Sequence, residues 1–334
     1  MKKYVNLFVF VFMIGACLSQ GRAQTKSAVS YKNPVVDIAM PDPTVIKATD
    51  GYFYVYATES TRNVPIMKSK DLVEWTYCNT AFTNKTRPRF EPKAGIWAPD
   101  INYINGKYVL YYAMSVWGGE QTCGIGVATA DSPQGPFTDH GKMFRSNEIG
   151  VQNSIDPSLL QYEGRNYLVW GSFRGIYVIE LTADGLSIMP GAKKKRIAGT
   201  AFEAVYIHKH GDYYYMFASI GSCCQGVKST YKVVVGRSKK VWGPYKDKTG
   251  KPMLKNGYSL VIGANDHFVG NGHGSQIIQD DAGQDWLLYH GFSRSTPENG
   301  RILLLDQIKW DQEGWPYVEG GSPSYETQKA PVFN

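Results

Sequence analysis

The sequence predicts an all-β fold, a five-bladed β-propeller that forms a single domain. Runs of Val, Ile, Tyr and Phe punctuated by glycine are typical of strands, and no long stretch carries the apolar period of a helix. One hairpin-like pattern also recurs five times along the 334 residues. Recurrence of short strands at intervals of about 40–50 residues or more is the signature of a propeller.

The repeating pattern is clearest in residues 151–175, where an Asp-Pro precedes an alternating apolar run, a Glu-Gly turn and a second strand-like run. The same order is found in residues 41–59, 99–115, 202–219 and 273–292. We expect each repeat to begin the innermost strand of its blade, so that the lead residues converge at one end of the axis. These lead residues are Asp42, Asp100, Asp156, Glu203 and Gly274.

The first two units are predicted at residues 31–80 and 96–144. In the first, residues 66–68 and 72–75 supply outer strand material. The second holds the strongest hairpin signal, because Asn105-Gly106 suits a type I′ turn. A third strand is expected over its residues 124–130, followed by a turn and a fourth strand.

The remaining units are predicted at residues 151–190, 201–253 and 272–319. No linker, charge block or low-complexity tract divides the chain, which argues against two domains. We therefore assign residues 31–320 to one catalytic propeller and residues 321–334 to a C-terminal tail.

The net charge of the chain is +7, and removing three basic residues of its leader leaves +4 (7 − 3). Basic residues are scattered, apart from a run at residues 193–196 that is typical of a solvated loop before a strand. The sequence therefore predicts no nucleic-acid binding.

Residues 1–23 resemble an export signal, with Lys2 and Lys3 before an apolar core too short to span a bilayer as a stable helix. Two cleavage patterns remain open. Gly21-Arg22-Ala23 would release a soluble chain, whereas residues 14–17 resemble a lipobox that would make Cys17 a lipid anchor. Either way we expect an exported protein that is periplasmic, secreted or held at the cell surface.

Four cysteines lie beyond the leader, at positions 78, 123, 223 and 224. Export permits disulfides, and four cysteines allow three pairings. Because Cys223 and Cys224 are adjacent, they are awkward partners for each other, and buried free thiols are the expectation.

Three lead residues with strongly marked surroundings are carboxylates: Asp42, Asp156 and Glu203. Gathered in one funnel, such groups cannot all keep ordinary pKa values, and repulsion and burial raise the pKa of at least one. One ionised and one protonated carboxyl is the requirement of glycoside hydrolysis. A single Asp-Pro is more often a structural turn, so the signal lies in the shared register of the three acids.

Five motifs in order along the chain resemble glycoside hydrolase family 43: Pro41-Asp42-Pro43, Trp97-Ala98-Pro99-Asp100, Ser154-Ile155-Asp156-Pro157, Phe202-Glu203-Ala204 and Gly272-His273-Gly274-Ser275. The resemblance covers roughly residues 31–320. Residues 153–156, 171–173, 223–226 and 229–231 resemble its arabinanase branch more narrowly. One departure is Arg174-Gly175, where that branch has a Trp-Ser-Gly type of segment.

The resemblance implies an inverting, single-displacement hydrolase of α-1,5-linked L-arabinan that acts inside the chain. Asp42 would be the general base, Glu203 the general acid, and Asp156 the residue that positions Glu203 and raises its pKa. His273 would lie beside a calcium ion near the axis that is largely coordinated by water. The residues implied to line the sugar subsites are Trp97, Asn153, Ser172 and Phe173.

Other functions remain open at the level of sequence. The same chemistry would serve an exo-acting α-L-arabinofuranosidase or β-xylosidase, because the sequence does not show whether loops leave a groove or a blind pocket. A fructan-cleaving relative should carry Arg before the middle Asp and Cys after the Glu, where this chain has Ile155 and Ala204. A non-catalytic glycan-binding propeller would need aromatics but not three carboxylates in register.

Overall fold

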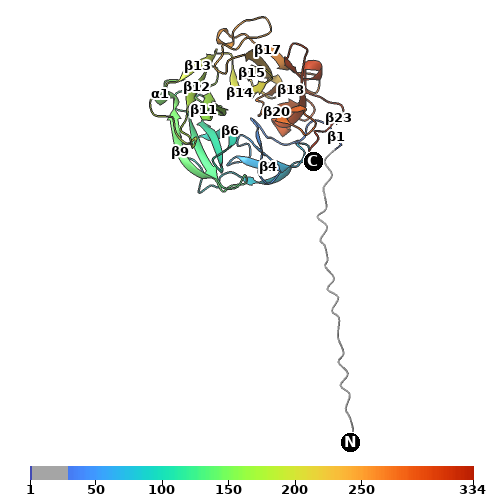
Figure 1. The fold of residues 1–334 in the computed structure, drawn as a ribbon, viewed down its shortest axis with the longest axis horizontal. Coiled ribbons are helices and arrows are strands. Elements are labelled where there is room, and N and C mark those ends of the chain that lie inside the picture. Colours follow the sequence, from blue (N-terminus) through green and yellow to red (C-terminus); the bar gives the residue numbers. More distant parts are fainter. Residues whose placement is uncertain (2–28) are drawn as a thin grey trace.

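Five antiparallel sheets surround a central axis in the computed structural model, which describes residue 1 and residues 29–334. Figure 1 shows the ring of blades viewed along that axis. The predicted five-bladed propeller is therefore confirmed. The predicted export signal, with both cleavage patterns and Cys17, lies outside the described residues. No helix in the described part of the chain is long and apolar enough to cross a membrane.

Blades 1 to 3 are four-stranded meanders in which consecutive strands pair. Blade 1 contains β2 (Thr44–Lys47), β3 (Phe53–Tyr56), β4 (Pro65–Ser69) and β5 (Thr76–Thr80). Blade 2 contains β6 (Gly95–Ile104), β7 (Lys107–Ser115), β8 (Gly124–Ala130) and β9 (Thr138–Arg145), and is followed by α1 (Ser146–Ile149). Blade 3 contains β10 (Ser158–Tyr162), β11 (Arg165–Trp170), β12 (Ile176–Glu180) and β13 (Lys195–Ala198).

Blades 4 and 5 complete the ring. Blade 4 contains β14 (Glu203–His210), β15 (Tyr213–Ile220), β16 (Lys232–Ser238) and β17 (Ser259–Ile262). Blade 5 contains β18 (Phe268–Gly272), β19 (Ile278–Gln279), β20 (Asp285–Ser293), β21 (Ile302–Trp310) and β22 (Pro316–Tyr317). Four short 3₁₀ helices lie between strands: η1 (Gly226–Lys228), η2 (Met253–Lys255), η3 (Pro297–Asn299) and η4 (Glu319–Gly321).

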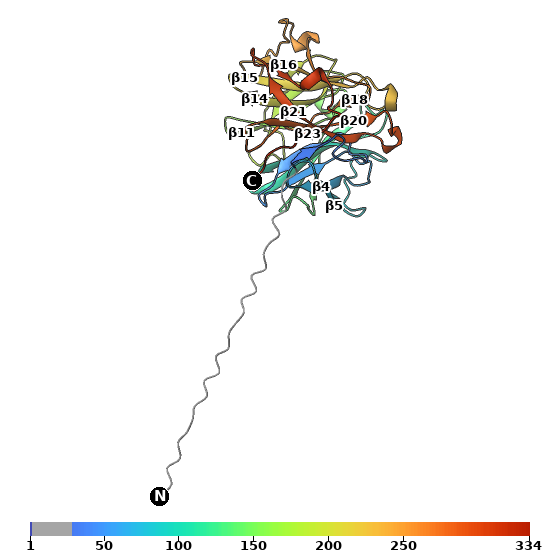
Figure 2. The same cartoon turned by 90° about the vertical axis from the view of Figure 1, so that its right-hand side faces the viewer.

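Both ends of the described chain close the ring. Residues 35–40 run beside β21, where Leu303 exchanges backbone hydrogen bonds with Val35 and Val36. At the other end, β23 (Gln328–Lys329) pairs with β1 (Ser30–Tyr31). The C-terminus thus lies beside the first blade, coloured blue (Figures 1 and 2). The segment predicted as a tail therefore packs on the propeller.

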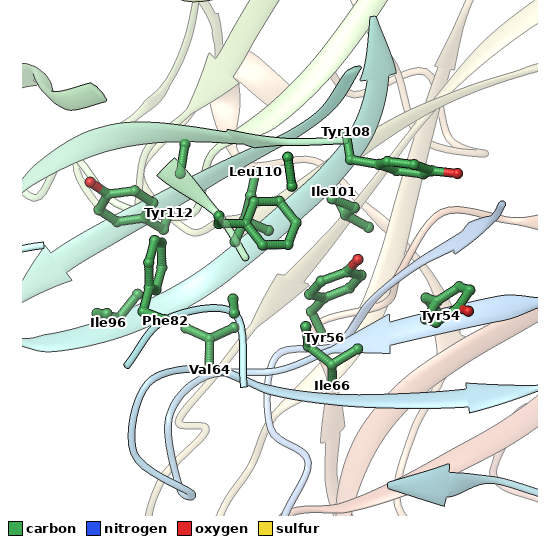
Figure 3. Close-up of a cluster of buried hydrophobic side chains, with 14 of the residues drawn as sticks. Tyr54, Tyr56, Val64, Ile66, Phe82, Ile96, Ile101, Tyr108, Leu110 and Tyr112 are labelled. Atoms are coloured by element: carbon green, nitrogen blue, oxygen red, sulfur yellow. The ribbon is translucent and has the colours of Figure 1, made fainter. Parts of the chain in front are cut away.

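The core lies mainly between neighbouring blades. Figure 3 shows one such cluster, with Tyr54, Tyr56 and Ile66 of blade 1 facing Leu110 and Tyr112 of blade 2. All four residues of β3 are buried, which explains why that strand reads as a continuous apolar run without polar alternation. Each blade thus buries both of its faces against its neighbours, and this packing around the ring holds the innermost strands in place.

The innermost strands share a backbone feature that corrects the predicted register. One residue within or next to the innermost strand of each blade has a positive φ between 42° and 56°: Asp42, Ala98, Asp156, Ala204 and His273. By this backbone feature, the predicted leads Asp100 and Gly274 are offset by two residues and one residue, and Glu203 precedes Ala204 although it begins β14 as predicted. The sequence could not show this, because the equivalence lies in φ and not in residue type.

Two predicted outer strands are also corrected. Residues 72–75 of blade 1 form a turn and not a strand, since Asp71 Oδ1 accepts hydrogen bonds from the N–H groups of Val73 and Glu74 at 3.0 and 2.9 Å. The outermost strand is β5 instead. Blades 3 and 4 extend past the predicted ends at residues 190 and 253, because β13 and β17 close them.

Candidate active site

A cavity of about 720 Å³ opens at the end of the axis where the innermost strands begin. Residues from all five blades line it. The eight predicted site residues are among them: Asp42, Trp97, Asn153, Asp156, Ser172, Phe173, Glu203 and His273. Asp100 and Gly274 line a separate, narrow axial cavity just below. Strained backbone gathers here as well, since Asn153 and Phe173 also have positive φ, at 55° and 51°.

Asp42 is a buried carboxylate held by several donors. Thr58 Oγ1 donates to Oδ2 at 2.6 Å, and Arg301 Nη1 donates to Oδ1 at 2.6 Å. His273 Nδ1 lies 3.2 Å from Oδ1. Burial alone would raise the pKa of Asp42, but Arg301 and His273 outweigh it and hold the pKa well below its usual range. Asp42 is therefore ionised at neutral pH.

His290 supports Asp42 from the core as a neutral imidazole. Its Nδ1 accepts a hydrogen bond from the backbone N–H of Asp42 at 3.0 Å, so that nitrogen carries no proton. Burial, followed by Arg301, lowers the pKa of His290 well below its usual value. Its Nε2 is buried and has no hydrogen-bond partner among the described residues. The ring therefore orients the Asp42 backbone without adding charge.

Glu203, the first residue of β14, is buried and lines the same cavity. Ser172 Oγ donates to its Oε2 at 2.6 Å, and Asn153 Nδ2 in turn donates to Ser172 Oγ at 2.9 Å. Burial raises the pKa of Glu203, while hydrogen bonds from Ser172 and Tyr231 oppose the rise. Glu203 thus differs from Asp42 in the way that acid–base chemistry requires: it tends to hold a proton.

Asp156 is a third buried carboxyl, close enough to Glu203 and Asp42 for their charges to affect its pKa. It accepts a hydrogen bond at Oδ2 from the backbone N–H of Ala204 at 3.1 Å, so it anchors the residue that follows Glu203. Burial raises its pKa, His273 lowers it, and the nearby charges of Glu203 and Asp42 raise it again. Asp156 and Glu203 are therefore a coupled pair of carboxyls that favours holding one proton between them.

The axial cavity below is lined by side-chain oxygens of the kind that bind a hard cation. Asp100, Asp156, Ser275, Gln276 and His273 line it. Burial raises the pKa of Asp100 to about 6, although its oxygens accept hydrogen bonds from Asn102, Leu159, Thr44 and Gln276. Oxygen donors suit calcium, and an imidazole would reach it through water. The residues present therefore fit the calcium ion implied by the resemblance.

Aromatic side chains form one wall of the larger cavity. The rings of Trp97 and Trp117 lie 5.4 Å apart, and Trp117 is 79% exposed. Phe173 also lines the cavity. Apolar ring faces beside hydrogen-bonding groups suit the faces and hydroxyls of a sugar chain.

Cys223 and Cys224 form a disulfide with each other on this cavity wall. The expectation of buried free thiols is wrong for this pair and holds for Cys123, which is buried and free. The pair lies in a surface loop, where Cys224 is exposed. Hydrogen bonds between Ser222 and Thr230 close the base of that loop.

Several site residues escaped the sequence analysis. Thr58, Arg301 and His290 all contact Asp42, and Trp117 extends the aromatic wall. Arg301 is 259 positions from Asp42 and carries no motif of its own. The Thr58 hydroxyl could not be found by pattern either, because hydroxyls are common at strand ends. Tyr231, which also lines the cavity, was singled out only as part of the segment 229–231.

Known proteins match this chain over most of its length. A family model described as "Glycosyl hydrolases family 43" matches residues 31–316. The extracellular endo-alpha-(1->5)-L-arabinanase 1 of Bacillus subtilis (strain 168) is 37% identical over 290 residues, 82% of this chain and 86% of that protein. The extracellular exo-alpha-(1->5)-L-arabinofuranosidase ArbA of Cellvibrio japonicus (strain Ueda107) is 36% identical over 307 residues, 83% of this chain and 86% of that protein.

A solved structure agrees as well. The α-L-arabinanase of Cellvibrio cellulosa in complex with arabinohexaose superposes with a TM-score of 0.77 and 33% identity. The match covers 85% of this chain and 96% of that one.

Proposed function

The chain belongs to glycosyl hydrolases family 43, and on that premise we propose that it hydrolyses α-1,5-linked L-arabinan at internal bonds. The observation that carries the proposal is one cavity lined by two buried carboxyls whose surroundings shift their pKa values in opposite directions. Asp42 is ionised and Glu203 is inclined to keep a proton. Separate base and acid groups on one substrate cavity are what glycoside hydrolysis needs.

The reaction is a single displacement. Asp42 takes a proton from a water molecule as that water attacks the anomeric carbon, and Glu203 donates its proton to the leaving glycosidic oxygen. The bond to the leaving sugar breaks as the bond to water forms, so the configuration inverts. NMR of the first-formed sugar checks this step, and retention of configuration would rule out direct attack by water.

Two further residues keep the acid ready. Ser172 fixes one oxygen of Glu203, and Asp156 anchors the backbone at Ala204. Asp156 and Glu203 are coupled, so ionisation of one raises the pKa of the other by repulsion, and the pair resists losing both protons. Asp156 thus acts as a positioning residue that does not itself attack the sugar.

The proposal also includes a calcium ion bound near the axis. His273 and Asp156 would face it, and water would complete its coordination. When bound, it would supply positive charge that offsets the repulsion among the buried carboxyls. Metal analysis of the pure protein should find about one equivalent of calcium, and chelation should lower the melting temperature. A calcium-free protein with full stability and activity would contradict this part.

Endo action is favoured by the exposed aromatic wall at Trp117, which can hold sugars beyond the two acids. Exo action, as an α-L-arabinofuranosidase or β-xylosidase, is the second candidate, because a relative with 36% identity is named as exo-acting. Product analysis on linear arabinan, with aryl arabinofuranoside and aryl xyloside alongside, separates them. A ladder of oligosaccharides supports endo action, and single sugars alone support exo action.

The same assay tests the non-catalytic alternative. Binding of arabinan without any product would make the protein a glycan-binding propeller. Export follows from the same proposal, since arabinan is a polysaccharide met outside the cell and two relatives are named extracellular. Labelling with a fatty-acid analogue distinguishes a lipid anchor at Cys17 from cleavage after Ala23, because only the anchored form takes up label.

A further inference from the structure

Two histidines and an aspartate meet at the end of the propeller opposite the catalytic cavity. His208 and His210 lie near the end of β14, whose first residue is Glu203. Seven residues of extended strand separate Glu203 from His210, a distance of roughly 23 Å. Asp285 begins β20 in the neighbouring blade 5. The group therefore joins blades 4 and 5 and takes no part in the site described above.

The donor atoms of these three side chains converge. The possible ligand atoms of His208, His210 and Asp285 all lie within 4.8 Å of one another. His210 Nδ1 is 3.7 Å from Asp285 Oδ2, which is too long for a hydrogen bond. Both histidines point to one side of the strand, because residues two apart on a strand share a face. The gap between the groups is thus the size of a bound ion's coordination sphere.

Hydrogen bonds orient the carboxylate of Asp285 so that it can serve as a metal ligand. It is buried, Trp310 Nε1 donates to its Oδ2 at 2.8 Å, and Gln279 Nε2 donates to its Oδ1 at 3.2 Å. A carboxylate has about four lone-pair positions, so both oxygens retain acceptor capacity after these bonds. Hydrogen bonds of this kind orient carboxylate ligands in metal sites.

The histidines are suited to the same role. Each neutral imidazole offers one ring-nitrogen lone pair to a metal ion. Both histidines are partly exposed, so an ion can enter from solvent. Imidazole nitrogens with one carboxylate oxygen suit zinc, copper and nickel, whereas calcium and magnesium prefer oxygen alone.

Ring packing explains part of this arrangement. His210 stacks on Trp310 with ring centroids 3.7 Å apart and planes within 10°. Stacking alone accounts for the position of that ring. His208 also stacks on Trp310, with ring centroids 6.2 Å apart. Stacking therefore places both rings, and the metal proposal rests on the convergence of their nitrogens with the Asp285 carboxylate.

We propose that His208, His210 and Asp285 bind a divalent transition-metal ion of the zinc type, with water in the remaining positions. Zinc binds nitrogen and oxygen ligands at about 2.0–2.2 Å, so tetrahedral ligands lie about 3.4 Å apart and the widest pair would close by at most about 1.4 Å. The ion stabilises the contact between blades 4 and 5. It has no role in the cleavage of the sugar chain.

The test measures binding of ZnCl₂ to the full mature chain by isothermal titration calorimetry and thermal unfolding. The protein is first stripped with EDTA, then kept in excess CaCl₂ so that an oxygen site near the axis is filled. We expect about one equivalent of zinc and a higher melting temperature. His208→Ala/His210→Ala should abolish both effects. Asp285→Asn, which preserves the shape of the side chain, should weaken zinc binding by about tenfold or more.

His140→Ala is the matched control, because His140 is exposed and lies in blade 2. It should bind zinc as the wild type does. All variants should keep arabinan hydrolysis, which also reports correct folding. The proposal is overturned if wild type takes up no zinc under these conditions. It is equally overturned if the double variant and Asp285→Asn, both folded, bind zinc as tightly as wild type.

Discussion

At the scale of single residues, the site works by giving two carboxyls different surroundings. Asp42 has a guanidinium, an imidazole and a hydroxyl on its oxygens, whereas Glu203 has only neutral hydroxyl donors. Burial disfavours charge on both, but only Asp42 has nearby cations that reverse this effect. The identity of the neighbours therefore shifts the pKa of the proposed base down and leaves that of the proposed acid raised.

Replacement of the acid should separate catalysis from binding. Glu203→Gln keeps the shape of the side chain but cannot donate a carboxylic proton. We expect kcat on linear arabinan to fall by about 10²–10⁴-fold, the usual contribution of a general acid. Calorimetry with a non-cleaved arabino-oligosaccharide should show a Kd near that of wild type. Full activity of this variant would remove Glu203 from the mechanism.

The pH profile should respond to Arg301. Activity requires ionised Asp42, so its acidic limb follows the pKa of that group. Arg301 holds this pKa low. Arg301→Met removes the cation, so the pKa of Asp42 rises and the acidic limb of kcat/KM moves to higher pH. Arg301→Lys, which keeps the charge, should shift the limb less. An unchanged acidic limb in Arg301→Met would contradict this coupling.

The alkaline limb should respond to Ser172. Activity requires protonated Glu203, and the pKa of Glu203 is raised by burial and lowered by the Ser172 hydrogen bond. Ser172→Ala removes that bond, so the pKa rises further and the alkaline limb moves to higher pH. We expect kcat at the optimum to fall at the same time, because the acid is less firmly oriented. A shift of the alkaline limb to lower pH would show that another group controls it.

At the scale of elements, the innermost strand of each blade has one residue in the left-handed region within it or next to it. Asp42 and Asp156 share this position with His273, so three blades present functional groups from equivalent places. Glu203 comes one residue earlier in its blade, beside a register shift between β14 and β15. Irregularities of this kind re-aim side chains near active sites.

The loop that carries Cys223 and Cys224 should tune substrate binding. Its disulfide lines the cavity and its second cysteine is exposed, so a small reductant can reach it. We expect reduction to loosen this wall and raise KM for arabinan severalfold, with a smaller effect on kcat. Cys223→Ser/Cys224→Ser should have the raised KM without reductant and show no response to it. A wild type that is indifferent to reductant would exclude the loop from substrate binding.

At the scale of the whole molecule, the ring is held closed by both ends of the described chain. Phe333, near the C-terminus, packs on Phe53 of blade 1 with ring centroids 4.6 Å apart. On the other side, residues 35–40 extend blade 5 along β21. The terminal segments thus bridge the only junction between blades that chain order does not connect.

Loss of this closure should lower stability. Phe333 is 9% exposed, and truncating a buried phenylalanine costs about 3–5 kcal/mol, with the lower end expected near a chain terminus. Phe333→Ala should therefore unfold at clearly lower temperature in calorimetry. Val332→Ala is the control, because Val332 is 45% exposed and should change little. Equal melting temperatures for the two variants would mean that the C-terminal segment does not close the ring.

The sequence by itself determined the fold class and the number of blades. It also indicated eight residues that line the cavity. Alternating aromatic strands with turn residues between them specify hairpins locally, and their fivefold recurrence specifies a ring. The predicted carboxylates are readable because each lies in a short motif at a strand start. Such features depend only on residues that are neighbours along the chain, so they can be read from the sequence.

Only the tertiary structure decided how these residues are supported. Arg301, Thr58 and His290 reach Asp42 from three different segments, and nothing in their own neighbourhoods marks them. The equivalence of Ala98 and Ala204 with Asp42 lies in backbone φ, which residue type does not reveal for alanine. Contacts across the ring join positions hundreds of residues apart, and their energies depend on distance in space. That is why the sequence indicated the acid and the base, while the folded chain determined their protonation.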